Sequence, residues 1–217
     1  MLNVYKYYDK SRELSLYSEL SSAIDQLEVL ANIDSIEGYE DDEYEEKIEI
    51  LRRMTPQSLK PLISIIMRSP IYAYNYAKHM LGEKRWPEGE PAIMKNPQYA
   101  YDYAKDVIKG RWPEAEKYIM KGPYWATLYA RDIIRNRWKE AESYIMKSPD
   151  AAYMYAKDVI KGRWEEAEPV IMRDPSSACY YAMYMIKGRW LEAEDAIKKV
   201  GYLWAVYCEM FKIHDSE

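Results

Sequence analysis

Apolar side chains recur with a helical spacing along most of the chain. In the segment 97–108 they fall at i, i+3, i+4, i+7 and i+8, the spacing that gathers side chains on one face of a helix: Ala100, Tyr103, Ala104, Val107 and Ile108. A shorter apolar set follows: Trp112, Ala115, Ile119 and Met120. The pattern therefore predicts two short helices, each burying one face.

Proline, glycine and acidic residues mark the helix ends. Pro97 and Pro113 open the two helices, because the fixed φ of proline suits the first helical position. We expect Gly110 to end the first helix in the left-handed conformation. Glu114 and Glu116 stand in the first turn of the second helix, where they favour the helix dipole and can contact the basic residues before Trp112. In later copies, the place of Gly110 is taken by Asn136, Gly162 and Gly188.

This pair of helices is repeated. The 26-residue spacing is kept by Trp86, Trp112, Trp138, Trp164 and Trp190, and methionines and prolines keep the same interval. Helices of about ten residues are too short to be stable alone in water, so stacking must supply what they lack. The sequence predicts an all-α fold, an α-solenoid superhelix of two-helix repeats with a period of 26 residues and a helical N-terminal cap.

The chain divides into four predicted parts. Residues 1–55 form a helical N-terminal cap with an acidic linker at 37–46, and residues 56–69 form a half repeat. Residues 70–200 hold five tandem two-helix repeats. Residues 201–217 form a degenerate C-terminal cap and tail, as expected of a terminal unit with water on one side.

The composition places the chain among globular proteins. Hydrophobic residues are 48% and charged residues 31%, enough to bury a core. No apolar run reaches the length of a membrane span, and the two cysteines make no disulfide framework. We therefore expect a soluble, reduced, cytoplasmic protein that does not bind membranes.

The net charge of −5 is unevenly distributed. Residues 1–49 carry 4 basic and 14 acidic side chains, a sum of −10, so the rest of the chain sums to +5. This excess is smaller than that of a dedicated nucleic-acid binder. A further hypothesis is that the acidic stretch 37–49 acts as a decoy that mimics DNA.

The repeated sequence motif resembles that of a known group of proteins. The unit "KDVIKGRWPEAE", followed by "IMK" and a proline, is similar to a tandem repeat of tailed bacteriophage proteins and covers about residues 70–208. The resemblance implies a helical-repeat fold and a phage-encoded or phage-derived protein, but no activity. A weaker similarity is to leucine-rich-variant repeats. The chain departs from the phage-like pattern at Lys139, Glu165, Leu191, Met183 and Tyr184.

No set of residues predicts catalysis, a cofactor or a metal site. Of the two histidines, His79 takes a repeat position that is aspartate in later copies, and His214 lies in the tail. No phosphate-binding loop or CxxC motif is present. The glutamates two residues apart, such as Glu114 and Glu116, do not face each other on a helix. We expect a protein that is not an enzyme.

Some positions vary while the repeat frame stays constant, and repeat proteins usually carry recognition at such positions. We predict that these residues contact a protein partner. Together with the phage resemblance, this prediction favours a host protein that a phage-encoded inhibitor would target. They flank the buried face of each first helix: Tyr74, Asn75, Lys78, Tyr101, Asp102, Lys105, Leu128, Arg131, Tyr153, Met154, Lys157, Tyr180 and Met183. Tyr, Met and Leu exposed in this way are typical of protein interfaces.

Two other hypotheses stay open. A nucleic-acid binder could use one basic turn and one stacking tryptophan per repeat. Its contacts would be Lys109, Arg111, Arg135, Arg137, Lys161, Arg163, Lys187 and Arg189. Alternatively, an aromatic-lined groove could sequester a small nucleotide-like ligand. The sequence does not decide the oligomeric state.

Overall fold

The computed structural model describes residues 22, 23, 25–31, 50, 53–55, 57 and 59–213. These residues form helices and turns and no strand, which confirms the all-α prediction for the described part of the chain. The chain divides into two compact units, Met1–Ile93 and Met94–Glu217. The predicted acidic linker and His214 lie outside the described residues.

The N-terminal unit, Met1–Ile93, has its own core. It contains η2 (Lys60–Leu62), α3 (Ile63–Ile66), α4 (Pro70–Asn75), the π-helical η3 (Tyr76–Met80) and α5 (Glu90–Ile93). A helical segment at 25–31 packs here through Val29 and Leu30, which join a buried cluster with Leu59, Ile66 and Tyr76. The predicted cap residues thus share one core with the first repeat.

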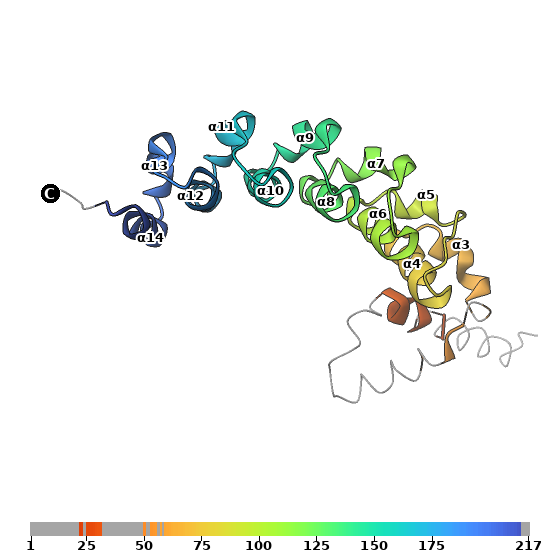
Figure 1. Ribbon diagram of the computed structural model, residues 1–217. Helices are drawn as coiled ribbons and strands as arrows, with labels where there is room; N and C mark the ends of the chain where they lie inside the picture. Colours follow the sequence, from red (N-terminus) through yellow and green to blue (C-terminus); the bar gives the residue numbers. More distant parts are fainter. Residues whose placement is uncertain are drawn as a thin grey trace, which may run out of the picture. The chain divides into compact units, whose positions relative to one another are not determined.

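The C-terminal unit, Met94–Glu217, contains two rows of helices (Figure 1). The first row is α6 (Pro97–Tyr103), α8 (Pro123–Tyr129), α10 (Pro149–Tyr155), α12 (Pro175–Tyr181) and α14 (Gly201–Phe211). The second row is α7 (Pro113–Ile119), α9 (Lys139–Ile145), α11 (Glu168–Ile171) and α13 (Leu191–Ile197), with the 3-10 turn η7 (Glu165–Ala167) before α11.

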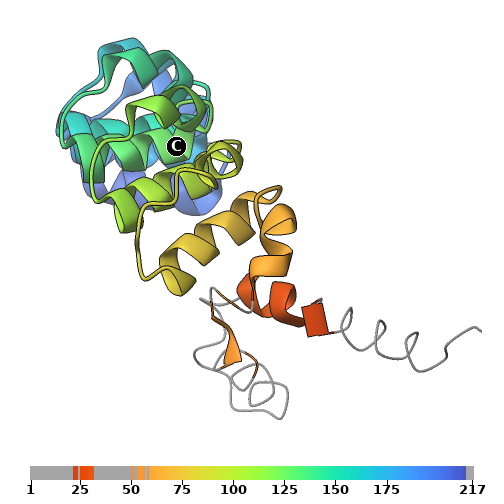
Figure 2. The same cartoon turned by 90° about the vertical axis from the view of Figure 1, so that its right-hand side faces the viewer.

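Each of α6, α8, α10 and α12 contacts the next helix in the first row and the second-row helix that follows it in sequence. Seen from the side in Figure 2, the repeats of this unit overlap one behind another. The two-helix repeat is therefore observed, with Pro97 and Pro113 at the predicted starts. That the rows wind into a superhelix stays a prediction.

The first helices end in π-helical turns. These are η4 (Ala104–Ile108), η5 (Ala130–Ile134), η6 (Ala156–Ile160) and η8 (Ala182–Ile186), each directly following its α-helix. The residue after each turn is left-handed: Lys109, Arg135, Lys161 and Lys187, with φ of 57°, 57°, 60° and 56°. The prediction that Gly110, Asn136, Gly162 and Gly188 take this conformation is wrong by one residue, because the wider turn brings the chain to its reversal earlier.

The buried faces follow the predicted pattern. Ala100, Tyr103, Ala104 and Ala115 are fully buried, and Trp112 is 1% exposed. The Tyr103 and Trp112 rings are in contact, with centroids 4.9 Å apart. Small alanines let neighbouring backbones approach while each Tyr–Trp pair fills the space between helices.

Candidate binding surface

A tyrosine closes each joint between successive repeats. Tyr155 in α10 accepts a hydrogen bond from the backbone N–H of Trp138 (2.6 Å) and donates to Glu142 Oε1 (3.2 Å). Arg137 holds the same carboxylate with two N–H groups, at 2.8 and 3.0 Å. We call this arrangement the tyrosine joint. It recurs with Tyr129, Tyr181 and Tyr207, which contact Trp112 and Glu116, Trp164 and Glu168, and Trp190 and Glu194.

The environment of the joint keeps the tyrosine hydroxyl protonated. Burial, opposed by the hydrogen bond from the tryptophan N–H and reinforced by the glutamate charge, raises the pKa of Tyr155, Tyr181 and Tyr207 to about 12. At the last joint, the hydrogen bonds from Arg189 hold the pKa of Glu194 below its usual value. The joint is therefore built to be stable over the neutral range.

These joints use much of the predicted nucleic-acid contact set. Arg111, Arg137, Arg163 and Arg189 each bind a glutamate of their own repeat through two hydrogen bonds. The indoles of Trp112, Trp138, Trp164 and Trp190 are only 1–4% exposed, so none can stack on a base without unfolding its joint. The other basic residues of the turns, Lys109, Arg135, Lys161 and Lys187, are exposed.

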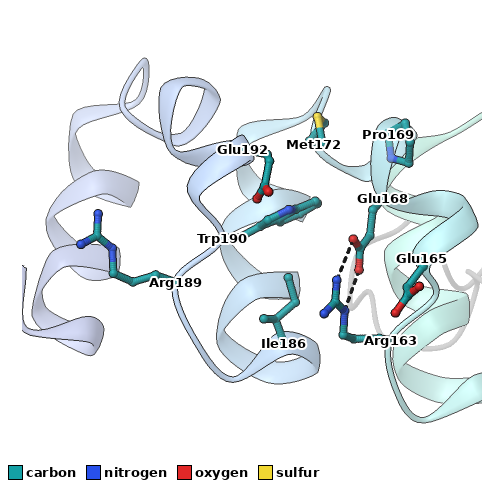
Figure 3. Close-up of a pocket in the computed structure, with 9 residues that line it drawn as sticks. All are labelled: Arg163, Glu165, Glu168, Pro169, Met172, Ile186, Arg189, Trp190 and Glu192. Atoms are coloured by element: carbon teal, nitrogen blue, oxygen red, sulfur yellow. Dashed lines mark hydrogen bonds and ion pairs between the residues drawn. The ribbon is translucent and has the colours of Figure 1, made fainter.

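A cavity of about 360 Å³ lies between α11 and α13 (Figure 3). Its lining comprises Arg163, Glu165, Glu168, Pro169, Met172, Ile186, Arg189, Trp190 and Glu192. Arg163 is bound to Glu168, and Arg189 is bound to Glu194. The remaining carboxylates make the cavity a poor fit for an anionic nucleotide, and the buried indole of Trp190 offers it little surface.

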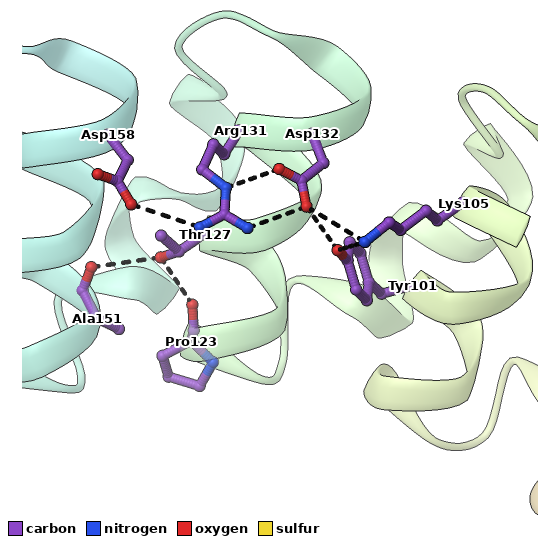
Figure 4. A network of polar contacts seen from close by, with 8 residues as sticks. All are labelled: Tyr101, Lys105, Pro123, Thr127, Arg131, Asp132, Ala151 and Asp158. Atoms are coloured by element: carbon purple, nitrogen blue, oxygen red, sulfur yellow. Dashed lines mark hydrogen bonds and ion pairs between the residues drawn. The ribbon is translucent and has the colours of Figure 1, made fainter. Parts of the chain in front are cut away.

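A row of polar side chains runs along the π-helical turns (Figure 4). Asp132 accepts hydrogen bonds from Tyr101 (2.6 Å) and Arg131 (2.6 Å), and Lys105 lies 3.9 Å away. Arg131 also reaches Asp158 of the next repeat at 3.5 Å. We call this set the polar ladder. Its charges compensate one another, and the hydrogen bonds from Arg131 are the main cause of a lowered pKa at Asp132.

The structure divides the predicted partner-binding residues into two groups. The prediction of exposure is wrong for five of them, which pack inside the stack: Tyr74, Asn75, Tyr101, Leu128 and Tyr153 are 3–9% exposed. The others are partly or fully exposed: Lys78, Asp102, Lys105, Arg131, Met154, Lys157, Tyr180 and Met183.

Two of the buried residues show why they are not surface contacts. Asn75 donates to the carbonyl oxygens of Leu30 (2.6 Å) and Ala31 (3.3 Å), the last described residues of the helical segment 25–31. Tyr101 belongs to the polar ladder and links its helix to the next. Both side chains face a neighbouring helix, so these positions vary with packing rather than with recognition.

The polar ladder stops at α12, and apolar side chains take its place. Met183 and Tyr184 stand where earlier repeats carry Arg131 and Asp132. Tyr180 is 40% exposed and Tyr184 is 50% exposed. On α14, which contacts α12, three more side chains are exposed: Tyr202 by 68%, Val206 by 42% and Met210 by 52%. We call the five exposed residues the C-terminal apolar surface: Tyr180, Tyr184, Tyr202, Val206 and Met210.

The tyrosines of this surface hold one another in place. The Tyr180 ring stacks against the Tyr184 ring at 6.3 Å and against the buried Tyr153 ring at 6.4 Å. The Lys157 ammonium lies 6.0 Å from the centre of the Tyr153 ring. Next to Tyr180 and Tyr184 in sequence, the buried Cys179 and the partly buried Met183 have their sulfur atoms 3.7 Å apart. The exposed rings therefore stand on a packed support.

Of this surface, sequence reasoning predicted Tyr180, together with its neighbour Met183, but not Tyr184, Tyr202, Val206 or Met210. A signal for Tyr184 was present, since it replaces an aspartate of the repeat frame. On α14, exposed residues at i, i+4 and i+8 lie beside the buried Leu203 and Tyr207. Treating residues 201–217 as a decayed cap hid this second apolar row.

Metal and membrane chemistry find no support in the described part of the chain. There, no group of three or more His, Cys, Asp or Glu side chains is placed to hold a metal ion. No helix among the described residues has the length and apolar character needed to cross a membrane.

Comparisons with known proteins place the chain in no group. No protein-family model matches it, and neither the curated proteins nor the solved structures give a match. Its function must therefore be argued from its own residues.

Proposed function

We propose that the chain is a non-enzymatic protein-binding scaffold whose contact site is the C-terminal apolar surface. The observation that carries this proposal is the exposure of Tyr180, Tyr184, Tyr202, Val206 and Met210 on two adjoining helices. Contiguous exposed apolar side chains are uncommon on monomeric proteins and mark interaction sites. Tyrosine and methionine are among the residues that protein interfaces favour.

The proposed nature of the partner rests on the resemblance of the repeated unit to tandem-repeat proteins of tailed bacteriophages, and not on the structure. A phage protein of this kind would act in the host cytoplasm, and we propose a host protein as its partner. An inhibitor of host defence is the sharpest form of this proposal. Inhibition would need no catalytic group, because binding alone would block the partner.

The chain itself supplies variants that test this proposal. Aspartate occupies the places of Tyr180 and Tyr184 in earlier repeats, as Asp102 and Asp158. The double variant Tyr180→Asp/Tyr184→Asp therefore removes apolar surface while keeping residues that the repeat accepts. Tyr124→Asp is the control, because Tyr124 is 43% exposed on α8, away from α12, and aspartate stands at its position as Asp150.

The experiment is capture from bacterial lysate with the tagged full chain and both variants, after circular dichroism has shown equal helicity. We expect the wild type and Tyr124→Asp to retain the same protein and the double variant to lose it. Equal capture by all three chains, or no capture by any, would contradict the proposal.

Nucleic-acid binding has weaker support. Its favourable observation is the row of exposed basic residues in the left-handed conformation, such as Lys161 and Lys187. Against it stand the paired arginines and buried indoles of the tyrosine joints. Binding of single-stranded DNA that weakens steeply with salt and is lost in Lys161→Glu/Lys187→Glu would favour this alternative.

A further inference from the structure

Resting on the proposed function, we propose that the C-terminal apolar surface binds an acidic, amphipathic helix of the partner protein. The surface begins where the polar ladder ends. The frame position that holds Asp132 and Asp158 becomes Tyr184, and the preceding basic position becomes Met183. The change removes both members of the ion pairs, so it replaces a self-contained polar contact with an apolar one.

The charged residues beside the surface differ from those of the polar ladder in having no ion-pair partner among the described residues. Along the polar ladder, Lys105 and Arg131 have carboxylate partners in Asp132 and Asp158. Beyond the ladder, the left-handed Lys187 and Lys212 directly follow the apolar rows of η8 and α14, and no described carboxylate forms an ion pair with either. Glu209 is the one exposed acidic residue among the described residues 201–213. Lys187, Glu209 and Lys212 thus leave a single net positive charge beside the surface, which favours an anionic partner.

The spacing of the apolar side chains on the surface suits a helical partner. Tyr202, Val206 and Met210 recur at i, i+4 and i+8 on α14, and Tyr180 and Tyr184 stand four residues apart on the adjoining helix. Two neighbouring apolar rows of this spacing suit a helix that presents its own apolar side chains at i, i+3 and i+4. The flexible Met210 side chain can adapt to the side chains that such a helix brings.

The tyrosine rings of the surface are already held in place before a partner binds. Tyr153, Tyr180 and Tyr184 already stack in sequence, and Tyr153 is 9% exposed. Rings held in this way lose little conformational freedom on binding, which favours affinity.

Other occupants fit less well. An anionic membrane would draw the lysines but would bury the Glu209 carboxylate against like charge. A second copy of this chain would bring Lys187 and Lys212 toward the same residues of its mate, which opposes association. An acidic helix avoids the second obstacle, and unlike a continuous anionic surface it can place its carboxylates beside the lysines and away from Glu209.

The test uses the full chain and two labelled peptides of about 15 residues, a length at which a helix can form. Both carry the same leucine, methionine and tryptophan face, and their polar faces hold glutamate in one and lysine in the other. Fluorescence anisotropy measures binding. We expect the acidic peptide to bind at least about 10-fold more tightly than the basic one, with an affinity that falls as salt is added.

Variants locate the site. Tyr180→Asp/Tyr184→Asp should weaken the acidic peptide by about 10-fold or more, and Tyr124→Asp should leave it unchanged. Lys187→Glu should reduce the preference for the acidic peptide without a change in helicity. An equal or stronger affinity for the basic peptide, no binding of either peptide, or a loss that Tyr124→Asp shares would overturn the inference.

Two further measurements separate the other occupants. Cosedimentation with vesicles of anionic lipid that the double variant abolishes would replace the helix by a membrane. A dimer in sedimentation equilibrium that the double variant dissociates would replace it by a second copy. If the basic peptide binds best while lysate capture still depends on Tyr180 and Tyr184, the protein-binding function stands and only the acidic partner falls.

Discussion

At the scale of single residues, the end of each first helix shows how a local rule is displaced. A glycine is available at Gly110, Gly162 and Gly188, yet the left-handed residue is the lysine before it. In η4, the N–H groups of both Lys109 and Gly110 bond to the carbonyl of Ala104. The π-helical turn thus closes one residue before the glycine, and the basic side chain gains from the negative end of the helix dipole.

Exchanges at Lys161 and Gly162 test this placement. Lys161→Val should lower the free energy of unfolding by about 1–2 kcal/mol, because a β-branched residue is strained at φ 60°. Gly162→Ala should change it by less than about 0.5 kcal/mol, since a Cβ there meets no atom and φ is not left-handed. Urea unfolding measures both. Lys161→Asn is the control and should be tolerated, and a larger loss in Gly162→Ala than in Lys161→Val would refute the placement.

At the scale of helices, the tyrosine joint links each repeat to the next. The Tyr155 hydroxyl accepts a hydrogen bond from the Trp138 N–H and donates one to Glu142. Both of these residues lie in the preceding repeat. Tyr155→Phe should therefore lower the free energy of unfolding by about 1–3 kcal/mol, because a buried N–H loses its partner. Chemical denaturation gives the value. Tyr180→Phe is the matched control, since that ring is 40% exposed, and equal losses in both variants would count against the joint.

The joints also make stability depend on alkaline pH. The hydroxyls of Tyr155, Tyr181 and Tyr207 keep their protons to about pH 12 when folded, whereas an ordinary tyrosine ionises near 10.0. The unfolded chain thus binds fewer protons than the folded one between these values, so stability is intact below pH 10 and falls as the pH rises to 12. Tyrosinate absorbance should rise together with loss of helicity. A Tyr155→Phe/Tyr181→Phe variant should lose stability less steeply over this interval, and an unchanged slope would refute the cause.

The sequence predicted the contacts within a repeat better than the contacts between repeats. Starts at Pro97 and Pro113, the buried Tyr103–Trp112 pair and the contact of Glu116 with Arg111 all follow from spacing within a repeat. The hydroxyl contact of Tyr129 to Trp112 crosses repeats, and only the constant interval of 17 residues could have suggested it. The π-helical turns left no signal in the apolar periodicity, so the left-handed position was predicted one residue late.

The same limit applies to the candidate surface. Variation between repeats pointed to the correct helices, but it could not separate residues that vary with packing, such as Asn75, from those that vary on the exterior, such as Tyr180. Exposure depends on the neighbouring helix, which the repeat pattern describes only on average. The terminal helix α14 has no repeat after it within the described residues, so its exposed row escaped the pattern altogether.

At the scale of the whole C-terminal unit, the contacts run between neighbours. Each first-row helix touches the next, and each joint joins one repeat to the following one. Stability should then be a sum of neighbouring interfaces, with the ends opening more easily than the middle. The last joint, Tyr207 with Trp190, has a further helix on one side only among the described residues.

Hydrogen exchange of the four joint amides can measure this gradient. We expect the Trp190 amide to exchange faster than those of Trp138 and Trp164, because opening α14 releases it without disturbing the interior joints. Tyr207→Phe should accelerate Trp190 further and leave Trp138 unchanged. If all of these amides exchanged at one common rate set by global unfolding, the unit would behave as a single cooperative block and the nearest-neighbour description would fail. An added acidic helix that binds at α14 should slow Trp190 selectively, which would tie the surface to the end of the stack that it covers.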